Sequence, residues 1–239
     1  MDMKYKRILL KISGEALMGE QQFGIDYKPV EMIANEIKKA AEFGVEIAVV
    51  VGGGNIFRGM KNSAKLGMDQ ASGDYVGMLA TVMNAVTLQS ALLKLDVPCR
   101  VQSALDIHKI AEPYIRFKAI RHLEKGRVVI FAAGTGNPFF TTDTAAALRA
   151  SEIGAEAMLM AKNGVDGVYD DDPRINPNAK KLDNITYDDI IINGLKVMDT
   201  ASCALCKQNS IPICVFDFAQ QGSIVKILKG EKIGTYVGG

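Results

Sequence analysis

The sequence predicts an α/β fold of three layers, an α/β/α sandwich in which helices cover both faces of a mostly parallel central sheet. Two observations lead to this expectation. Short apolar runs rich in valine and isoleucine alternate along the chain with longer segments whose apolar residues recur at helical spacing. The short runs are nearly continuous in apolar character, which is typical of parallel strands buried on both faces. With 239 residues, 48% of them hydrophobic, the chain can form a sizeable core.

The first strand–helix–strand unit is expected over residues 6–51. Residues 6–12 form a short apolar run, and residues 29–43 carry Val30, Ile33 and Ile37 at the 3.6-residue period of a helix. Gly44 then ends this helix, and residues 45–51 are a nearly continuous run of apolar strand formers. This order predicts one βαβ unit with a right-handed crossover.

The same alternation continues along the rest of the chain. We expect helices at residues 73–95, 113–123, 142–153, 195–208 and 223–228, and strands at 97–102, 127–132, 157–161 and 211–216. Residues 170–186 are polar and turn-forming, but no linker rich in proline, serine or charge divides the chain. We therefore expect one domain over residues 1–239, with one lobe to about residue 133 and a second from 134 to 239.

Charge and hydropathy exclude several functions. The 28 basic and 27 acidic side chains leave almost no net charge, which argues against a nucleic-acid partner. The N-terminus lacks a signal-peptide pattern, and polar residues, glycine or proline are expected to interrupt every stretch long enough to span a membrane. We expect a cytoplasmic protein.

The cysteines are interpreted as reduced core thiols. Cys203 and Cys206 have the spacing of half a zinc site, but the two histidines, His108 and His122, lie far from them in sequence and lack ligand spacing. Neither histidine has a visible partner or an assigned role. The pair is expected to lie on one buried helix face.

A glycine run follows the second strand. Because ligands bind beyond the carboxyl ends of parallel strands, Gly52, Gly53 and Gly54 are placed to meet an anion, with N–H groups turned inward as a nest. Arg58 adds a fork for a phosphate. Neither the Walker A pattern nor G-x-G-x-x-G is present, and a glycine run alone is also compatible with a simple turn.

Two further features bear on phosphate chemistry. Lys11 lies near the end of the first strand, where it is either a phosphate ligand or a lysine that reaches solvent at the strand mouth. The loop over residues 134–143 leads into an alanine-rich helix, and its Thr141, Thr142 and Asp143 are also typical of a helix cap.

Five segments together resemble the bacterial uridylate (UMP) kinase family of the amino acid kinase superfamily. They are residues 11–17, 52–59, 73–84, 134–143 and 165–173, and they follow one another in the same order over essentially the full chain. The first is shared across the superfamily, whereas the combination of the next three is specific to the uridylate branch. The resemblance implies the amino acid kinase fold, with an acceptor-side lobe before about residue 133 and an ATP-side lobe after it.

The resemblance also implies a reaction and its regulation. The implied enzyme transfers the γ-phosphoryl group of ATP to UMP, giving UDP and ADP in pyrimidine nucleotide (CTP) biosynthesis. Magnesium would be bound through the ATP phosphates rather than by a metal site of the protein. A homohexamer activated by GTP and inhibited by UTP is expected.

Site residues follow by position in the family. Catalytic roles are expected for Lys11, Asp143 and Arg58. ATP would be bound by Lys11, Ile12, Ser13, Gly14, Gly54, Arg58, Asn163, Tyr169 and Asp172. UMP would be bound by Gly53, Asp74, Thr135, Gly136, Asn137, Pro138, Phe139, Phe140, Thr141 and Thr142. The effector region would include Gly19, Glu20, Gln21, Gln22, Phe23 and Gly24, together with Arg100 and Arg127. Lys162 is expected as a second phosphate contact.

Two alternatives stay open on the sequence. One is another kinase of the superfamily that acts on a carboxylate, carbamate or isoprenoid phosphate. The other is a non-catalytic nucleotide-binding protein on the same fold, although such a protein should have lost Lys11 and Asp143, which this chain retains. The threonines and phenylalanines of residues 134–143 favour a planar base and a phosphate over an amino acid.

Overall fold

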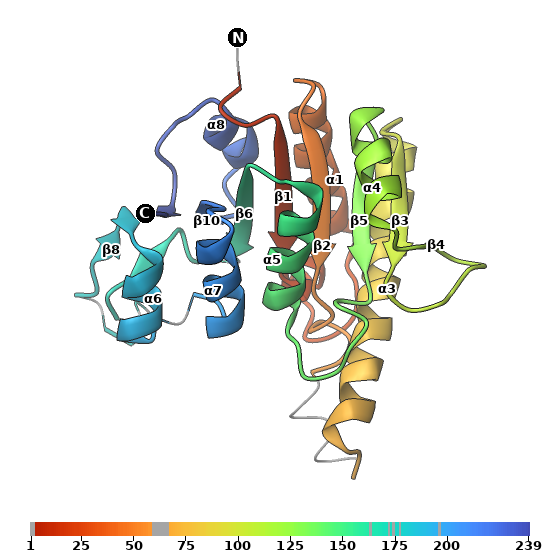
Figure 1. Ribbon diagram of the computed structural model, residues 1–239, viewed down its shortest axis with the longest axis horizontal. Coiled ribbons are helices and arrows are strands. Elements are labelled where there is room, and N and C mark those ends of the chain that lie inside the picture. Colours follow the sequence, from red (N-terminus) through yellow and green to blue (C-terminus); the bar gives the residue numbers. More distant parts are fainter. Residues whose placement is uncertain are drawn as a thin grey trace.

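The computed structural model describes residues 3–58, 67–162, 164–171, 173, 175–176, 178–195 and 197–239. At its centre is a nine-stranded sheet with the order β4-β3-β5-β2-β1-β6-β10-β11-β9 (Figure 1). Its strands are β1 (Arg7–Ile12), β2 (Glu46–Val51), β3 (Cys99–Ser103), β4 (Glu112–Pro113), β5 (Val128–Ala132), β6 (Ala157–Lys162), β9 (Asn184–Ile185), β10 (Ile213–Asp217) and β11 (Thr235–Val237). Within this sheet only β10 and β11 pair antiparallel, which confirms the mostly parallel sheet.

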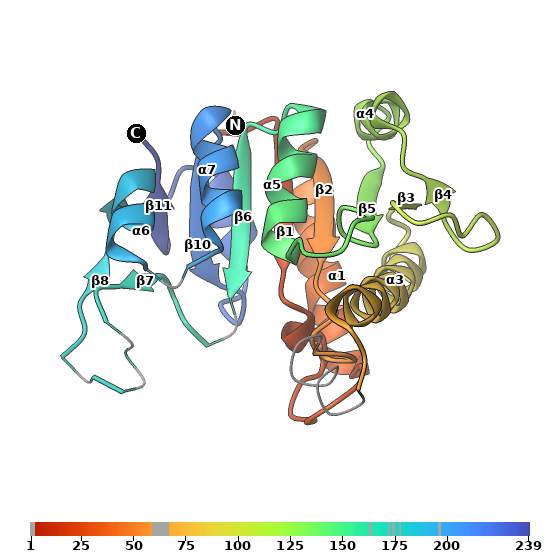
Figure 2. The ribbon, with the colours of Figure 1, turned by 60° about the horizontal axis from the view of Figure 1, so that its bottom comes forward.

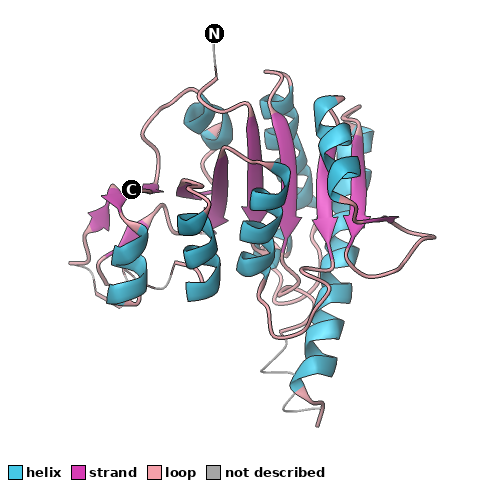
Figure 3. Ribbon diagram, viewed as in Figure 1, coloured by secondary structure: helices cyan, strands magenta, loops and turns pink. Residues whose placement is uncertain are grey.

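Helices cover both faces of the sheet, as Figures 2 and 3 show. They are the 3-10 helix η1 (Gly14–Leu17) and the α-helices α1 (Tyr27–Ala41), α3 (Gln70–Lys94), α4 (Arg116–Glu124), α5 (Thr142–Ile153), α6 (Tyr187–Asn193), α7 (Thr200–Gln208) and α8 (Ser223–Leu228). One buried cluster joins the sheet to α1, α3 and α8, and a second joins it to α4, α5, α6 and α7. The expected three layers are confirmed.

The alternation of β1 decides where its lysine points. Ile8, Leu10 and Ile12 lie in the cluster with α1 and α3, whereas Leu9 lies in the cluster with α5. Since successive side chains of a strand face opposite sides of the sheet, Lys11 shares the face of Leu9. The strand therefore directs Lys11 toward α5.

The topology places a crevice beside β1. Strands β1 to β5 occupy one side of the sheet, and β6, β10, β11 and β9 occupy the other. The strand order thus reverses between β1 and β6, and in open α/β sheets ligands bind at the carboxyl ends of the strands at such a reversal. Lys11 and Lys162 lie at these two strand ends.

Several boundaries differ from the sequence predictions. The helix expected from residue 195 begins at Thr200, because Asp199 caps it by accepting a hydrogen bond from the N–H of Ser202. The helix expected from residue 113 begins at Arg116, since Glu112–Pro113 pairs with β3 as β4. Residues 170–186 are not only turns: Lys181–Leu182 (β8) pairs with Val168–Tyr169 (β7), and β9 follows. Helix α6 and strand β11 were not predicted.

Helix α3 corrects one expectation about membranes. It has 25 residues, and a window of 18 of them has a mean hydropathy of 1.5, so by length and composition it could cross a membrane, contrary to the prediction that every such stretch is interrupted. In the fold it is a core helix, because Met78, Ala85, Leu88 and Leu92 belong to the buried cluster beneath the sheet.

Candidate functional site

The site centres on an ion pair between the first strand and helix α5. Lys11 Nζ lies 2.7 Å from Asp143 Oδ1, and Lys11 is only 8% exposed. Asp143 stands in the first turn of α5, whose N-cap Thr141 accepts hydrogen bonds from the N–H groups of Asp143 and Thr144. The alternative that Lys11 merely reaches solvent is therefore wrong, and the N-cap of α5 fixes the carboxylate that the lysine meets.

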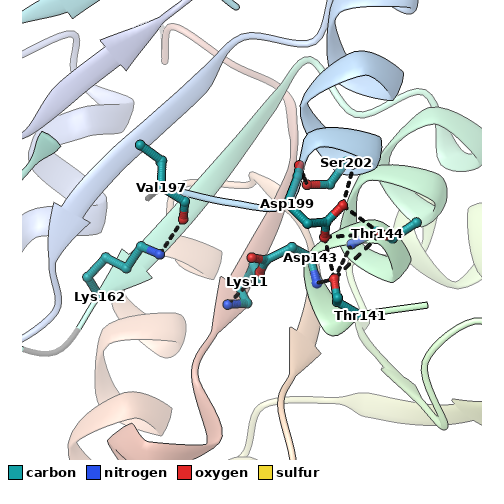
Figure 4. A network of polar contacts seen from close by, with 8 residues as sticks. All are labelled: Lys11, Thr141, Asp143, Thr144, Lys162, Val197, Asp199 and Ser202. Atoms are coloured by element: carbon teal, nitrogen blue, oxygen red, sulfur yellow. Dashed lines mark hydrogen bonds and ion pairs between the residues drawn. The ribbon is translucent and has the colours of Figure 1, made fainter. Parts of the chain in front are cut away.

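Lys162 brings a second positive charge to this pair. It ends β6, next to β1, and its Nζ donates a hydrogen bond to the carbonyl of Val197 at 2.5 Å (Figure 4). Burial lowers the pKa of Lys162, the positive charge of Lys11 lowers it further, and Asp143 opposes both. Two ammonium groups around one carboxylate favour a bound anion.

Asp199 holds the starts of α5 and α7 together. Its carboxylate accepts hydrogen bonds from the hydroxyl of Thr144 at 3.0 and 3.1 Å, from the hydroxyl of Thr141, and from the N–H of Ser202 at 2.8 Å (Figure 4). Asp199 was not among the residues predicted from the sequence. The pattern of an aspartate three residues before Ser202 is a helix N-cap signal, but the expected helix start at residue 195 concealed it.

Two cavities adjoin the charged group. The first, of about 420 Å³, is lined by Lys162, Val165, Gly167, Val168, Tyr169, Asp170, Asp171, Pro173, Asn193, Gly194, Leu195, Val197 and Val215. The second, of about 250 Å³, is lined by Gly53, Gly54, Phe57, Gly73, Asp74, Gly77, Met78, Thr81, Gly134, Thr135, Phe140, Thr141 and Thr142. Lys162 lines the first, and Thr142, next to Asp143, lines the second. Lys11 and Asp143 themselves line neither cavity.

The glycine run borders the second cavity. None of Gly52, Gly53 and Gly54 has a positive φ, so the N–H groups of the run lie in a turn and not in a conformation of alternating handedness. Gly53 is also needed for packing, because a Cβ there would lie 2.8 Å from the carbonyl oxygen of Gly77. In the described part of the chain, the N–H groups of Gly53 and Gly54 donate to no acceptor, so they are free for a ligand.

Helix α3 holds both ends of the loop that follows β5. The N–H of Ala133 donates to Thr81 Oγ1, and the N–H of Phe139 donates to Asp74 Oδ2, each at 2.8 Å. Ala133 and Phe139 have φ values of 64° and 71°, which are uncommon outside glycine. Phe139 and Phe140 are exposed. Two bonds to one helix thus stabilise a loop with unfavourable backbone conformations.

Of the residues expected to bind ATP, Tyr169 lines the first cavity. Gly54 lines the second cavity together with Gly53, rather than the first. Arg58 lines neither cavity: its Nη2 lies 2.6 Å from Glu15 Oε1, and its side chain is half exposed. Ile12, Ser13 and Gly14 lie at the end of β1 and the start of η1. Asn163 and Asp172 lie outside the described residues.

The residues expected to bind UMP lie on the second cavity or on its loop. Those that line the cavity are Gly53, Asp74, Thr135, Phe140, Thr141 and Thr142. Gly136, Asn137, Pro138 and Phe139 belong to the same loop but do not line the cavity. Gly136 has a φ of 82°, and a Cβ there would lie 2.9 Å from the carbonyl oxygen of Ala104.

The structure separates the two regions expected to bind effectors. The segment over residues 19–24 lies beside the glycine run, where the N–H of Gly24 donates to the carbonyl of Asn55 at 2.8 Å. Arg100 and Arg127 lie at the amino ends of β3 and β5, the opposite end of the sheet. His122 is 3.1 Å from Glu112 Oε2 and 3.0 Å from Arg127 Nη1, so the prediction that it has no partner is wrong.

The four cysteines are free and buried, in agreement with the predicted core thiols. Among the described residues, no group of three or more histidine, cysteine, aspartate or glutamate side chains is arranged to hold a metal ion.

Comparisons with known proteins bear on both the fold and the site. The sequence model of the Amino acid kinase family matches residues 6–217. The crystal structure of UMP kinase from Bacillus anthracis is 39% identical, with a TM-score of 0.95 over 98% of this chain and 96% of that one. UMP kinase from Ureaplasma parvum is 40% identical, with a TM-score of 0.93 over 99% and 100%. Uridylate kinase from Archaeoglobus fulgidus is 29% identical, with a TM-score of 0.74 over 96% and 99%.

Proposed function

The chain belongs to the amino acid kinase family, and from this premise we propose that it transfers the γ-phosphoryl group of ATP to UMP, giving UDP and ADP. The likeness to two UMP kinases over nearly the whole chain supports this reaction. The observation that carries it is the ion pair of Lys11 and Asp143, together with one cavity lined by Lys162 and a second lined by Thr142, the neighbour of Asp143. A kinase with two nucleotide substrates needs two pockets whose phosphate ends meet at positive charge. We place the reaction in pyrimidine nucleotide (CTP) synthesis and the protein in the cytoplasm.

We assign UMP to the second cavity and ATP to the first. The second cavity has the carboxylate of Asp74 for ribose hydroxyls, threonine hydroxyls for the base and phosphate, and the flat rings of Phe57 and Phe140 beside them. The first cavity offers Tyr169 for the nucleoside of ATP and has Lys162 at its phosphate end. Gly54, at the rim of the second cavity, would then contact the phosphates from the UMP side.

Phosphoryl transfer at this site needs charge neutralisation more than covalent help. The transition state is largely dissociative, and a phosphate monoester with a second pKa of about 6 is mostly dianionic at pH 7. UMP therefore needs no general base. Lys11 and Lys162 neutralise charge on the transferred group, and Asp143 orients Lys11 through the ion pair. Arg58 would join them by exchanging Glu15 for a phosphate oxygen.

Magnesium would enter with ATP. Because the described residues gather no set of three metal ligands, its ligands would come mainly from the phosphates. Asp143 Oδ1 is buried and is occupied by the ion pair with Lys11, so this carboxylate oxygen would hold the lysine and not the metal. When bound, the metal would supply positive charge that offsets the negative charge of the ATP phosphates.

We propose that the protein is a homo-oligomer, a hexamer by resemblance. The support is an exposed apolar stripe on α3: Tyr75, Leu79 and Met83 follow at intervals of four residues, and each is at least 43% exposed. A second copy of the helix would cover this stripe. GTP activation and UTP inhibition belong to the same proposal, with residues 19–24 or the pair Arg100 and Arg127 as effector contacts.

The reaction is tested by measuring ADP release from ATP with UMP, CMP and glutamate as separate acceptors. We expect rapid release with UMP and little with glutamate. Release with glutamate alone would favour another kinase of the family, and no release with any acceptor, in a protein that still binds ATP, would favour a non-catalytic binding protein.

A further inference from the structure

Two buried asparagines form a closed hydrogen-bond pair beneath the glycine run. Asn84 Nδ2 donates to Asn55 Oδ1 at 2.7 Å, and Asn55 Nδ2 donates to Asn84 Oδ1 at 3.0 Å. The second hydrogen of each amide is also used: Asn84 donates to the carbonyl of Gly52 at 2.6 Å, and Asn55 donates to the carbonyl of Gly24 at 2.9 Å. Asn84 is fully buried, and Asn55 is 2% exposed. Every amide hydrogen of the pair has an acceptor.

The bond from Asn84 to Gly52 fixes a peptide plane. A trans peptide is flat, and the carbonyl of one residue points opposite to the N–H of the next. Since the Gly52 carbonyl is held toward Asn84, on the core side of the run, the N–H of Gly53 must point the other way. That N–H donates to nothing in the described part of the chain, and Gly53 and Gly54 line the second cavity.

The same carbonyl is confined from another side. A Cβ at Gly14 would lie 2.5 Å from the Gly52 oxygen and 2.7 Å from Asn55 Oδ1. The peptide therefore has little room to rotate while Gly14, Asn55 and Asn84 stay in place. Removing the Asn84 amide leaves a buried carbonyl without its donor, which it can regain only by turning toward water.

We propose that Asn84 is a positioning residue for phosphoryl transfer: through Gly52 and with Asn55, it aims the N–H groups of the glycine run at the phosphate of the acceptor nucleotide. This inference rests on the proposed UMP kinase reaction. Asn84 acts through the backbone and does not touch substrate. Gly24 forms hydrogen bonds with both the side chain and the backbone carbonyl of Asn55, so the segment over residues 19–24 is coupled to this pair and to the glycine run.

The test compares Asn84→Ala and Asn55→Ala with the wild type. Asn84→Ala removes the donor to Gly52, whereas Asn55→Ala removes only its partner and leaves that donor in place. We expect kcat with UMP to fall about 10- to 100-fold in Asn84→Ala and KM for UMP to rise, with KM for ATP within about twofold. In Asn55→Ala the kinetic change should be several-fold smaller. Asn35→Ala is the matched control, since the Asn35 amide also donates to a backbone carbonyl, that of Glu31, within α1.

Thermal unfolding separates positioning from folding. If Asn84→Ala unfolds too readily to assay, Asn84→Ser, which keeps a small donor, replaces it, and we expect its kcat with UMP to fall several-fold below that of the wild type. Wild-type kcat and KM for UMP in a folded Asn84 variant would overturn the inference, as would equal losses for both substrates in both asparagine variants. A wild-type protein without UMP-dependent ADP release would instead overturn the proposed reaction.

Discussion

Replacing Lys11 by methionine removes the ammonium group at the centre of the site and keeps the length of the side chain. Lys11 is 8% exposed and pairs with Asp143 at 2.7 Å, so its ammonium is held in place before substrate binds. Deletion of one such preorganised donor costs about 10²- to 10³-fold in kcat, or roughly 3 to 4 kcal/mol. We expect a loss of that size in Lys11→Met.

The fold should survive this change. Breaking a buried ion pair can cost about 3 to 5 kcal/mol because it leaves an uncompensated charge. Here the loss is smaller, because the Asp143 side chain is 19% exposed and Lys162 supplies a second positive charge close by. Methionine also suits the apolar surroundings of β1.

The assay measures kcat and both KM values by coupled ADP release, with circular dichroism and thermal unfolding on the same samples. Lys207→Met is the matched control, since Lys207 forms an exposed ion pair with Asp188 at 2.6 Å, lines neither cavity and should not alter kcat. A folded Lys11→Met protein with kcat within about threefold of the wild type would refute the assigned role of Lys11.

Four further outcomes follow from the structure. Burial and the positive charge of Lys11 lower the pKa of Lys162 below its ordinary 10.5, so kcat should fall at alkaline pH as Lys162 loses its proton. In a pH–rate profile this fall should be absent or weaker in Lys162→Arg, because arginine keeps its charge. Asp199→Ala should lower the free energy of unfolding, measured by urea denaturation, by about 1 to 3 kcal/mol, because the hydroxyl of Thr144 loses its acceptor. In the double variant with Thr144→Val, the loss should be smaller than the sum of the two single losses. Asp74→Ala should raise KM for UMP more than KM for ATP in steady-state kinetics, and an unchanged KM for UMP would contradict the assigned cavity. Burial raises the pKa of Cys206 to about 12 and that of Cys99 to about 11, so iodoacetamide at pH 8 should label these thiols only after unfolding, as mass spectrometry would show.

Much of the fold was predictable because it depends on local patterns. The apolar runs of β1, β2 and β5 and the helical period of α1 gave the layers and the element order. The prediction was wrong where the apolar pattern runs past a local helix cap, or where an element is too short to show a pattern. Helix α7 starts five residues later than expected because Asp199 caps it. Strands such as β7 and β8 have two residues each, which is too short to show any period.

The candidate site was predictable only in part. Lys11, Asp143 and the glycine run were identified from strand ends and resemblance, but the backbone of Gly52 to Gly54, whose φ angles are ordinary, could not be predicted from the glycine content. Asp199 and Asn84 were missed. Their side chains resemble a helix cap and an interior helix residue, and only their partners on other elements give them a role.

By itself, the sequence determined the three-layer α/β architecture and the places along the chain where phosphate chemistry could occur, because periodicity and glycine content are local properties. Only the tertiary structure decided that Lys11 faces Asp143, that Lys162 joins them, and that Asn84 fixes the peptide after Gly52. These contacts join residues far apart in sequence, and they form only when the fold packs β1 between β6 and β2, α5 over β1, and α3 against the end of β2.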